Sequence, residues 1–325
     1  MVAIAEEATA GAIANPMLPL REGLRHLFSR QPIEKGRSVR SRRQGYRWLC
    51  FLLVFVTAAL PGASLHAVAA AAVAATRWVP PEPGIHARMS FQWQLSGVIE
   101  TSYRADVYDI DLFDAPPAIV QRLHAAHRRA VCYLSAGSYE DWRSDAGAFL
   151  RHRAVLGRPY PGWPGERWLD IRNISVLGPI MRSRLDLCKR KGFDGVEADN
   201  VDGYTADGGT GFPLSATDQL RYNRWLAAQA HARGLSVGLK NDGEQAAVLQ
   251  PAFDWALTED CFQQGWCDQE EPFLRARKAV FSAEYTDVTS GSAVEGYCVR
   301  AAAMGISLIY KQRDLGAWAR TCGTR

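Results

Sequence analysis

Short apolar runs alternate with stretches of helical periodicity from Val107 to Lys311, and this alternation limits the possible folds more than any other feature of the sequence. Apolar runs of this length, bounded by glycine, proline and polar residues, are typical of buried parallel strands. The expected strands are Val107–Phe113, Ala130–Ser135, Trp168–Ile171, Phe193–Asp199, Ser236–Lys240, Phe253–Glu259, Ala279–Tyr285 and Ile306–Lys311.

The stretches between these strands carry helix signals. A helix is expected after Pro116-Pro117, because proline favours the first helical turn, and Ser215 with Asp218 fits a capping box. Eight strand–helix units within residues 78–325 predict an α/β fold with one catalytic domain, a (β/α)8 or TIM barrel of ordinary size. In such a barrel the chemistry lies at the C-terminal ends of the strands.

Residues 1–77 differ from this body and are interpreted as a leader. Residues 1–47 are basic and are expected to be disordered, and the apolar run Trp48–Leu60 follows directly, which is the anatomy of an export signal. The Ala-rich tract Ala67–Ala75 offers cleavage sites, but it also lengthens the apolar span toward the roughly 20 residues of a membrane helix. Residues 48–77 are therefore either a signal peptide or a membrane anchor with an Ala-rich linker. The body is expected outside the cytoplasm, either secreted, periplasmic or tethered at the cell surface through residues 48–75.

Charge and cysteine usage narrow the function classes. The leader carries 10 Lys+Arg against 4 Asp+Glu, which leaves a slightly acidic body with 28 against 30. An acidic body argues against a nucleic-acid partner and agrees with a neutral or cationic substrate. We expect disulfides between Cys261 and Cys267 and between Cys298 and Cys322, whereas Cys132 and Cys188 are expected to be buried thiols. Neither zinc-ligand spacing nor a phosphate-binding glycine loop is found, so we expect no metal and no cofactor. The protein is expected to be a monomer.

The stretch Gly192 to Tyr204, GFDGVEADNVDGY, places three carboxylates on and beside a short apolar strand. Burying an ionised carboxylate is costly unless a partner or a chemical role compensates for it. Asp199, at the C-terminal end of the strand, is expected to face a substrate, and Glu259 ends a second apolar strand in the same way. The alternative is that these acids cap the next turn or pair with Arg and Lys.

Other polar and aromatic residues lie at or near the expected strand ends and are candidates for substrate binding. Structural explanations cover many of them individually, because loop acids cap helices and aromatic rings also pack in cores. The candidates are Trp93, Asp109, Asp111, Tyr133, Glu140, Asp141, Asp170, Glu197, Asn200, Tyr204, Lys240, Asn241, Glu284 and Tyr285.

Eight blocks of this sequence, in order, resemble the endo-α-1,4-polygalactosaminidases, glycoside hydrolase family 114. The resemblance runs from about Phe91 to Lys311, and it departs from the family at Ala198, where proline is common. The blocks are WQLSG, VYDIDLFDAP, CYLSAGSYEDWR, WPGERWLDIR, GFDGVEADNVDGY, TGFPLSATDQLRYNRWLA, VGLKND and TEDCF.

The resemblance implies a barrel enzyme that cleaves α-1,4-linked galactosamine or N-acetylgalactosamine exopolysaccharide at internal linkages of the polysaccharide. It makes Asp199 the nucleophile and Glu259 the general acid/base. Retention requires the two carboxyl groups about 5–5.5 Å apart and inversion about 6.5–9.5 Å, and we expect retention. Glu259 must be protonated to act as an acid, so we also expect burial or a nearby carboxylate such as Asp199 to raise its pKa.

Two other functions remain open at this point. The chain could be a non-catalytic carbohydrate-binding barrel at the cell surface, or a hydrolase of a different α-linked glycan. Fold alone supports none of these, because barrels host many chemistries. The presence of both Asp199 and Glu259 favours the enzyme. The C-terminal helix expected after Lys311 is short, which leaves the closure of the barrel open.

Overall fold

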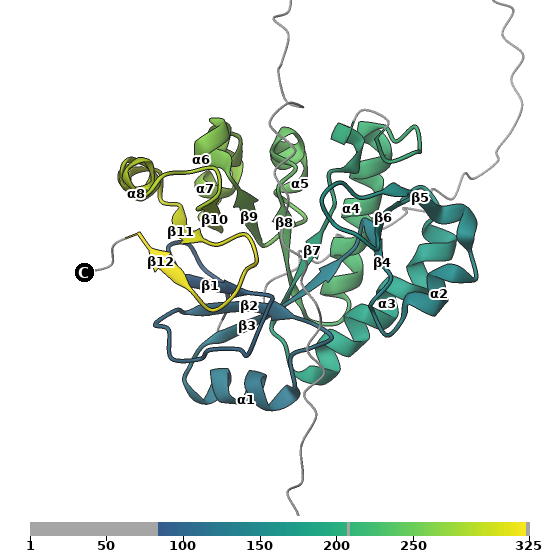
Figure 1. The fold of residues 1–325 in the computed structure, drawn as a ribbon, viewed down its shortest axis with the longest axis horizontal. Helices are drawn as coiled ribbons and strands as arrows, with labels where there is room; N and C mark the ends of the chain where they lie inside the picture. Colours follow the sequence, from purple (N-terminus) through teal and green to yellow (C-terminus); the bar gives the residue numbers. More distant parts are fainter. Residues whose placement is uncertain (1–83, 207–208, 323–325) are drawn as a thin grey trace, which may run out of the picture. The chain divides into compact units, whose positions relative to one another are not determined.

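Eight parallel strands form the centre of the molecule (Figure 1). The computed structural model describes residues 84–206 and 209–322. The strands hydrogen-bond as neighbours in chain order, and a short ninth strand pairs antiparallel with the last of them. They are β1 (Phe91–Gln94), β2 (Val107–Asp111), β3 (Arg129–Ser135), β7 (Gly195–Asp199), β8 (Ser236–Lys240), β9 (Trp255–Glu259), β10 (Ala279–Tyr285), β11 (Ser307–Lys311) and the antiparallel β12 (Ala319–Thr321). The predicted (β/α)8 barrel is confirmed.

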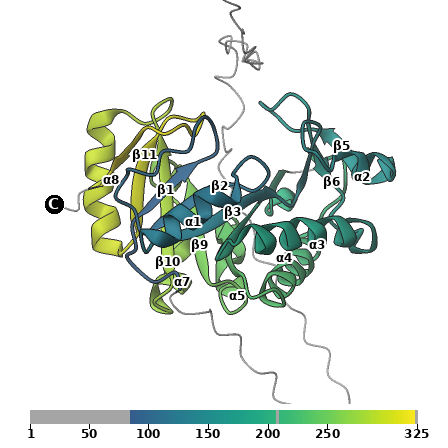
Figure 2. The ribbon, with the colours of Figure 1, turned by 90° about the horizontal axis from the view of Figure 1, so that it is seen from below.

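Helices follow the strands and cover the outside of the barrel (Figures 1 and 2). They are α1 (Pro117–Ala125), α2 (Ala146–Leu150), α3 (Ile174–Lys191), α4 (Ala216–His231), α5 (Ala246–Leu249), α6 (Cys261–Gln264), α7 (Glu271–Arg275) and α8 (Gly291–Met304). Short 3-10 turns span Arg153–Val155, Gly203–Ala206, Gly243–Gln245 and Cys267–Glu270. The expected signals are present: α1 begins with Pro117, and Ser215 and Asp218 form a reciprocal capping box at the start of α4. Helix α3 ends at Gly192, whose φ of 92° suits the left-handed cap.

One expected barrel strand lies elsewhere. The prediction for Trp168–Ile171 is wrong, because β6 (Glu166–Leu169) pairs antiparallel with β4 (Ser138–Glu140) and β5 (Leu156–Pro159) in a separate sheet. This small sheet and α2 lie to one side of the barrel (Figure 1). No described strand takes that position, because β3 pairs directly with β7. The eighth strand of the barrel is β1, which pairs with β2 and whose buried Gln92 and Gln94 look polar in the sequence.

Side chains join the two ends of the sheet. In the seam between β1 and β11, Lys311 donates to the carbonyl of Gly316 at 2.7 Å and lies 3.4 Å from Oε1 of Gln92. The Nε2 of Gln92 donates to the carbonyl of Ala317 at 2.8 Å. The backbone N–H of Leu95, just beyond β1, donates to the carbonyl of Leu315. The C-terminal segment therefore closes the barrel with a loop and β12, not with the expected helix.

Apolar side chains fill two layers, one inside the barrel and one between the strands and the helices. The inner layer includes Phe91, Trp93, Trp255 and Phe281. Gly238 on β8 is required there, because a Cβ at this position would lie about 2.3 Å from the indole of Trp255. This packed apolar layer closes the barrel below its mouth.

Three disulfides cross-link the described part of the chain. The bonds Cys261–Cys267 and Cys298–Cys322 confirm the expected pairs. Cys132 and Cys188, expected as buried thiols, instead form a third disulfide with a Cα–Cα distance of 6.2 Å. The expectation was wrong because Cys132 of β3 and Cys188 of α3 face each other across the outer core, a relationship that sequence spacing does not reveal.

The predicted leader, residues 1–47 and 48–77, lies outside the described residues. Within the described ranges, none of the helices has both the length and the apolar character needed to cross a bilayer.

Candidate active site

Lys240, the last residue of β8, lies between two carboxylates from the neighbouring strands. Its Nζ is 3.0 Å from Oδ1 of Asp199, which ends β7, and 2.5 Å from Oε2 of Glu259, which ends β9. These two carboxylate oxygens are therefore at most 5.5 Å apart. The Lys240 side chain is only 3% exposed, against 17% for Asp199 and 27% for Glu259. The strand-end rule thus brings together both predicted catalytic residues, with Lys240 beneath them.

The backbone turns sharply after each of these three residues. Asn200, Asn241 and Asp260 follow them directly and have φ values of 61°, 52° and 52°. Asn and Asp adopt this left-handed conformation more readily than other residues with side chains. Each strand therefore ends abruptly, with its last side chain at the rim of the barrel.

In both Asp199 and Glu259, the carboxylate oxygen that does not contact Lys240 meets a tyrosine hydroxyl. The hydroxyl of Tyr133 donates to Oδ2 of Asp199 at 3.0 Å, and the hydroxyl of Tyr285 contacts Oε1 of Glu259. Burial raises the pKa of both phenols well above the usual value, which keeps them protonated as donors. Asn241 also brackets Glu259, since its Oδ1 accepts the Glu259 backbone N–H at 3.0 Å and its Nδ2 lies 3.5 Å from Oε2.

Below Lys240 lies a second, fully buried pair of acids. Asp109 of β2 and Glu197 of β7 lie close enough to affect each other's pKa, and Oε1 of Glu197 is 4.0 Å from Lys240 Nζ. Burial raises the pKa of Glu197 well above its usual value and that of Asp109 to about 7, which favours the protonated form of Glu197. Trp93, expected to bind substrate, has its ring centroid 5.2 Å from the Lys240 Nζ and is 1% exposed. It forms the floor of the site.

The pKa of Glu259 differs from expectation. Burial acts to raise it, but the charge of Lys240 and the hydrogen bonds from Lys240 and Tyr285 outweigh burial and lower this pKa. The expected rise does not occur, because the nearest charge is a cation in direct contact and not the carboxylate of Asp199.

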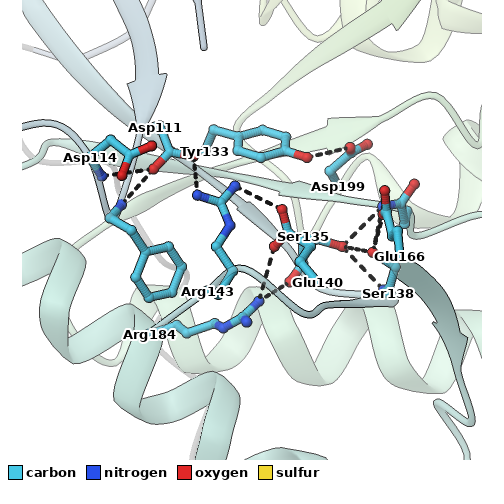
Figure 3. A network of polar contacts seen from close by, with 12 residues as sticks. Asp111, Asp114, Tyr133, Ser135, Ser138, Glu140, Arg143, Glu166, Arg184 and Asp199 are labelled. Carbon is cyan, nitrogen blue, oxygen red and sulfur yellow. Dashed lines mark hydrogen bonds and ion pairs between the residues drawn. The ribbon is translucent and has the colours of Figure 1, made fainter. Parts of the chain in front are cut away.

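Polar side chains surround Asn200, the residue after Asp199. Three of them, Ser135, Ser138 and Glu166, are labelled in Figure 3. The side-chain amide of Asn200 donates to Ser135 Oγ, Ser138 Oγ and Glu166 Oε1 at 3.0–3.1 Å. Ser138 also donates to Glu166. Burial and the nearby charge of Asp199 contribute to raising the pKa of Glu166 to about 7. The small side sheet therefore contributes to the placement of Asp199 through Glu166.

Several expected binding residues lie in other contacts. Asp111 and Glu140 both pair with Arg143, at 2.7 and 2.8 Å (Figure 3). Asp170 pairs with Arg172, and Glu284 accepts the backbone N–H groups of Phe262 and Gln263 at the start of α6.

Two further candidates lie apart from the Lys240 cluster. Tyr204 lies 3.1 Å from Asp242 Oδ1, and Asp141 is exposed. Binding roles for these five acids and for Tyr204 stay predictions.

Sequence reasoning assigned no role to three polar residues near the site, Glu166, Arg313 and Tyr160, and recognised Asp202 only as a polar residue at a strand end. Glu166 contacts Asn200, and Arg313 pairs with Asp260 beside Glu259. Asp202 is affected by the charges of Lys240, Asp199 and Glu259, and burial raises its pKa to about 6. Burial raises the pKa of the Tyr160 hydroxyl, and the charge of Asp199 adds to this rise. Asp202 lies in the DNVD turn after the strand and Glu166 lies in the block WPGERWLDIR, whereas nothing local marked Arg313 or Tyr160.

Between residues 84 and 322, apart from the undescribed 207–208, the structure has no group of three His, Cys, Asp or Glu side chains suited to a metal ion. The absence of a metal or cofactor in the working protein stays a prediction.

Comparisons with known proteins agree with this geometry. A model of glycoside hydrolase family GH114 matches residues 67–325. Ega3 of Aspergillus fumigatus, solved in complex with galactosamine, is 35% identical with a TM-score of 0.69, covering 73% of this chain and 96% of that one. The glycoside hydrolase domain of PelA from Pseudomonas aeruginosa, 15% identical with a TM-score of 0.54, shares the fold over 71% of this chain and 97% of that one. No curated protein matches the sequence.

Proposed function

Because this protein belongs to glycoside hydrolase family GH114 and is a glycoside hydrolase, we propose that it cleaves a partly N-acetylated, α-1,4-linked galactosamine polymer at linkages inside the polymer. Asp199 is the nucleophile and Glu259 the general acid/base. The galactosamine complex of the 35% identical Ega3 supports the choice of sugar.

The observation that carries the proposal is the position of Lys240 between the two carboxylates. Oδ1 of Asp199 and Oε2 of Glu259 lie at most 5.5 Å apart because both contact Lys240 Nζ. A separation of about 5–5.5 Å is typical of retaining glycosidases, in which one carboxylate is close enough to attack the sugar directly. This favours retention over inversion.

In the first step, an oxygen of Asp199 attacks the anomeric carbon while the bond to the leaving oxygen breaks and Glu259 gives its proton to that oxygen. In the second step, ionised Glu259 takes a proton from water, and the water oxygen displaces Asp199 from the anomeric carbon. Two inversions give net retention. Lys240 and Tyr133 hold Asp199 in place, and Lys240 favours the ionised Glu259 that the second step needs.

The charge around the mouth suits a cationic sugar polymer. Asp199, Asp202 and Glu259 lie at the strand ends near two cations, Lys240 and Arg313, and Arg313 itself pairs with two further acids, Asp260 and Asp287. An excess of acids attracts the ammonium groups of galactosamine. Acetylated residues, which are neutral, gain less from this field.

Export of the protein is part of the proposal. The three disulfides are bonds that persist in oxidising compartments, and the apolar run Trp48–Leu60 after a basic segment has the pattern of an export signal. We expect the enzyme to act outside the cytoplasm as a monomer, either released or held at the membrane by residues 48–75.

The test is to incubate the purified protein with partially deacetylated α-1,4-galactosamine polymer, beside Asp199→Asn and Glu259→Gln. Short oligosaccharides in the mass spectrum from the wild type, and almost none from either variant, are the expected result. Proton NMR of the first products then reads the anomer, and the α-anomer is expected.

Three outcomes would contradict parts of the proposal. Polymer that is retained on the protein without cleavage favours the carbohydrate-binding barrel. Cleavage of another α-linked glycan but not of this one changes the substrate. Wild-type turnover in Asp199→Asn or Glu259→Gln removes the assigned roles.

A further inference from the structure

Arg313, in the loop between β11 and β12, joins the ends of three neighbouring strands. Its Nη2 lies 2.9 Å from Oδ2 of Asp260, after β9, and its Nε lies 2.7 Å from Oδ2 of Asp287, after β10. Its guanidinium also stacks on the ring of Tyr285, the last residue of β10, 4.0 Å from the centroid. The side chain is 40% exposed, so it lies at the surface of the barrel mouth.

Two of these partners position Glu259. Asp260 follows Glu259 directly and has a φ of 52°, so it fixes the turn that ends β9. Tyr285 places its hydroxyl on Oε1 of Glu259. Arg313 therefore holds Glu259 from both sides, through the backbone and through the phenol, without contacting its carboxylate.

The loop that carries Arg313 also closes the barrel seam. The carbonyl of Leu315 accepts hydrogen bonds from the backbone N–H groups of Leu95 and Ser96, and the carbonyl of Ala317 accepts one from the side-chain amide of Gln92 on β1. The position of Arg313 thus depends on the seam, and the seam is connected to the surroundings of Glu259.

Charged and titratable groups face Glu259 from every neighbouring element. Lys240 is the cation in contact, and Arg313 is a second cation that acts at longer range to lower the pKa of Glu259. The acids and the phenol around it are Asp199, Asp202, Asp260 and Tyr285. Removal of Arg313 leaves Lys240 as the remaining cation among these groups.

We propose that Arg313 is a positioning residue for the general acid/base: it fixes the Tyr285 hydroxyl and the Asp260 turn so that Glu259 is held in its working orientation and charge state. This inference rests on the proposed function, in which Glu259 is the acid/base. It assigns a role in the reaction to the C-terminal loop, which sequence patterns do not mark.

The test compares Arg313→Met, which removes charge and hydrogen bonds while keeping part of the stacking, with Arg313→Lys, which keeps the charge but not the paired geometry. Arg320→Met is the matched control, because Arg320 lies in the same C-terminal segment and pairs with exposed Glu295. In Arg313→Met we expect kcat to fall roughly 10-fold with little change in KM, well short of the 10²–10⁴-fold for losing a general acid. The alkaline limb of kcat/KM should move to higher pH.

Arg313→Lys should keep the alkaline limb near that of the wild type while losing part of kcat, and Arg320→Met should match the wild type in both. A carboxyl-¹³C glutamate NMR titration, with the Glu259 signal assigned from Glu259→Gln, measures the same pKa without substrate. We expect the Glu259 titration to move to higher pH in Arg313→Met.

The inference is overturned if both the NMR titration and the pH limb stay at wild-type positions in Arg313→Met. It is equally overturned if only the melting temperature falls, because that identifies a purely structural residue. If the wild type releases no oligosaccharide, the proposed function fails, while the NMR titration still decides whether Arg313 controls Glu259.

Discussion

The Nζ of Lys240 lies 2.5 Å from Oε2 of Glu259, so the proposed acid/base of this hydrolase is already an ion pair before any sugar binds. A general acid works only while it is protonated. The contact with Lys240 lowers the pKa of Glu259 against the opposing effect of burial. The enzyme should therefore lose acid catalysis at a lower pH than one with an isolated buried glutamic acid.

Replacing Lys240 with methionine should move the alkaline limb of kcat/KM to higher pH. The sign follows from the pair: without the cation, burial dominates, the pKa of Glu259 rises, and the acid stays protonated over a wider range. The maximal rate should nevertheless fall, roughly 10²-fold or more, because Asp199 also loses its contact with Lys240. Measuring kcat/KM against pH for Lys240→Met tests both, with exposed Lys189→Met as the control. If the alkaline limb of the kcat/KM profile stays at its wild-type pH in Lys240→Met, then Lys240 does not set the pKa of Glu259.

Glu166 offers a test of the network beside Asp199. Its Oε1 accepts from Asn200 Nδ2 at 3.0 Å and from Ser138. Glu166→Gln keeps an oxygen that accepts both bonds, so kcat should stay within a few-fold of the wild type, whereas Glu166→Leu leaves Asn200 and Ser138 without this acceptor and should lower kcat roughly 10–100-fold. Equal rates in the two variants would mean that the acceptor does not position Asp199.

The parts of the fold that the sequence predicted are those in which both faces of a strand are buried by apolar residues. β8 and β10 have the predicted bounds, Ser236–Lys240 and Ala279–Tyr285. β1 was missed because Gln92 and Gln94 look exposed, although both are buried and bond to backbone carbonyls. The run near Trp168 was misplaced because an apolar run does not say which sheet it joins.

The same limit applies to the site. The strand-end rule was enough to bring Asp199, Lys240 and Glu259 together, because the ends of parallel neighbours meet at one edge. The direction of the Glu259 pKa shift depends on which charge is in contact, and that is a matter of a few ångströms between side chains. The roles of Arg313 and Glu166 could not be predicted, because each reaches the site from a segment distant in sequence. Arg313 has no motif of its own, and the block WPGERWLDIR that contains Glu166 does not indicate a contact with Asn200.

The Cys132–Cys188 disulfide should contribute more to stability than Cys261–Cys267. It joins residues 56 apart in sequence, compared with 6, and the entropy lost by the unfolded chain grows with loop length, giving about 4 and about 2 kcal/mol respectively. Urea unfolding of the two double alanine variants measures the difference. Unfolding midpoints that are equal, or in reverse order, would contradict the loop-length argument.

Glu270 should make the protein less stable as the pH rises. Its side chain is 0% exposed, and among the described residues neither of its oxygens meets a hydrogen-bond donor. Burial raises its pKa from 4.5 to about 8. Between these values the folded protein keeps the proton and the unfolded chain releases it, so the free energy of unfolding falls across this window.

Glu270→Gln removes this dependence while keeping the shape of the side chain. The variant should unfold near the wild-type urea concentration at pH 4.5 and at a higher one at pH 8.5, with a gain of at most about 5 kcal/mol. Some pH dependence should remain, because Asp242, whose pKa is raised to about 8 mainly by burial, titrates in the same range. Glu295→Gln, at a residue with a 70% exposed side chain, is the control and should show no such gain. A gain for Glu270→Gln that is equal at both pH values would mean that the carboxyl does not ionise in this window and that the glutamine acts through packing alone.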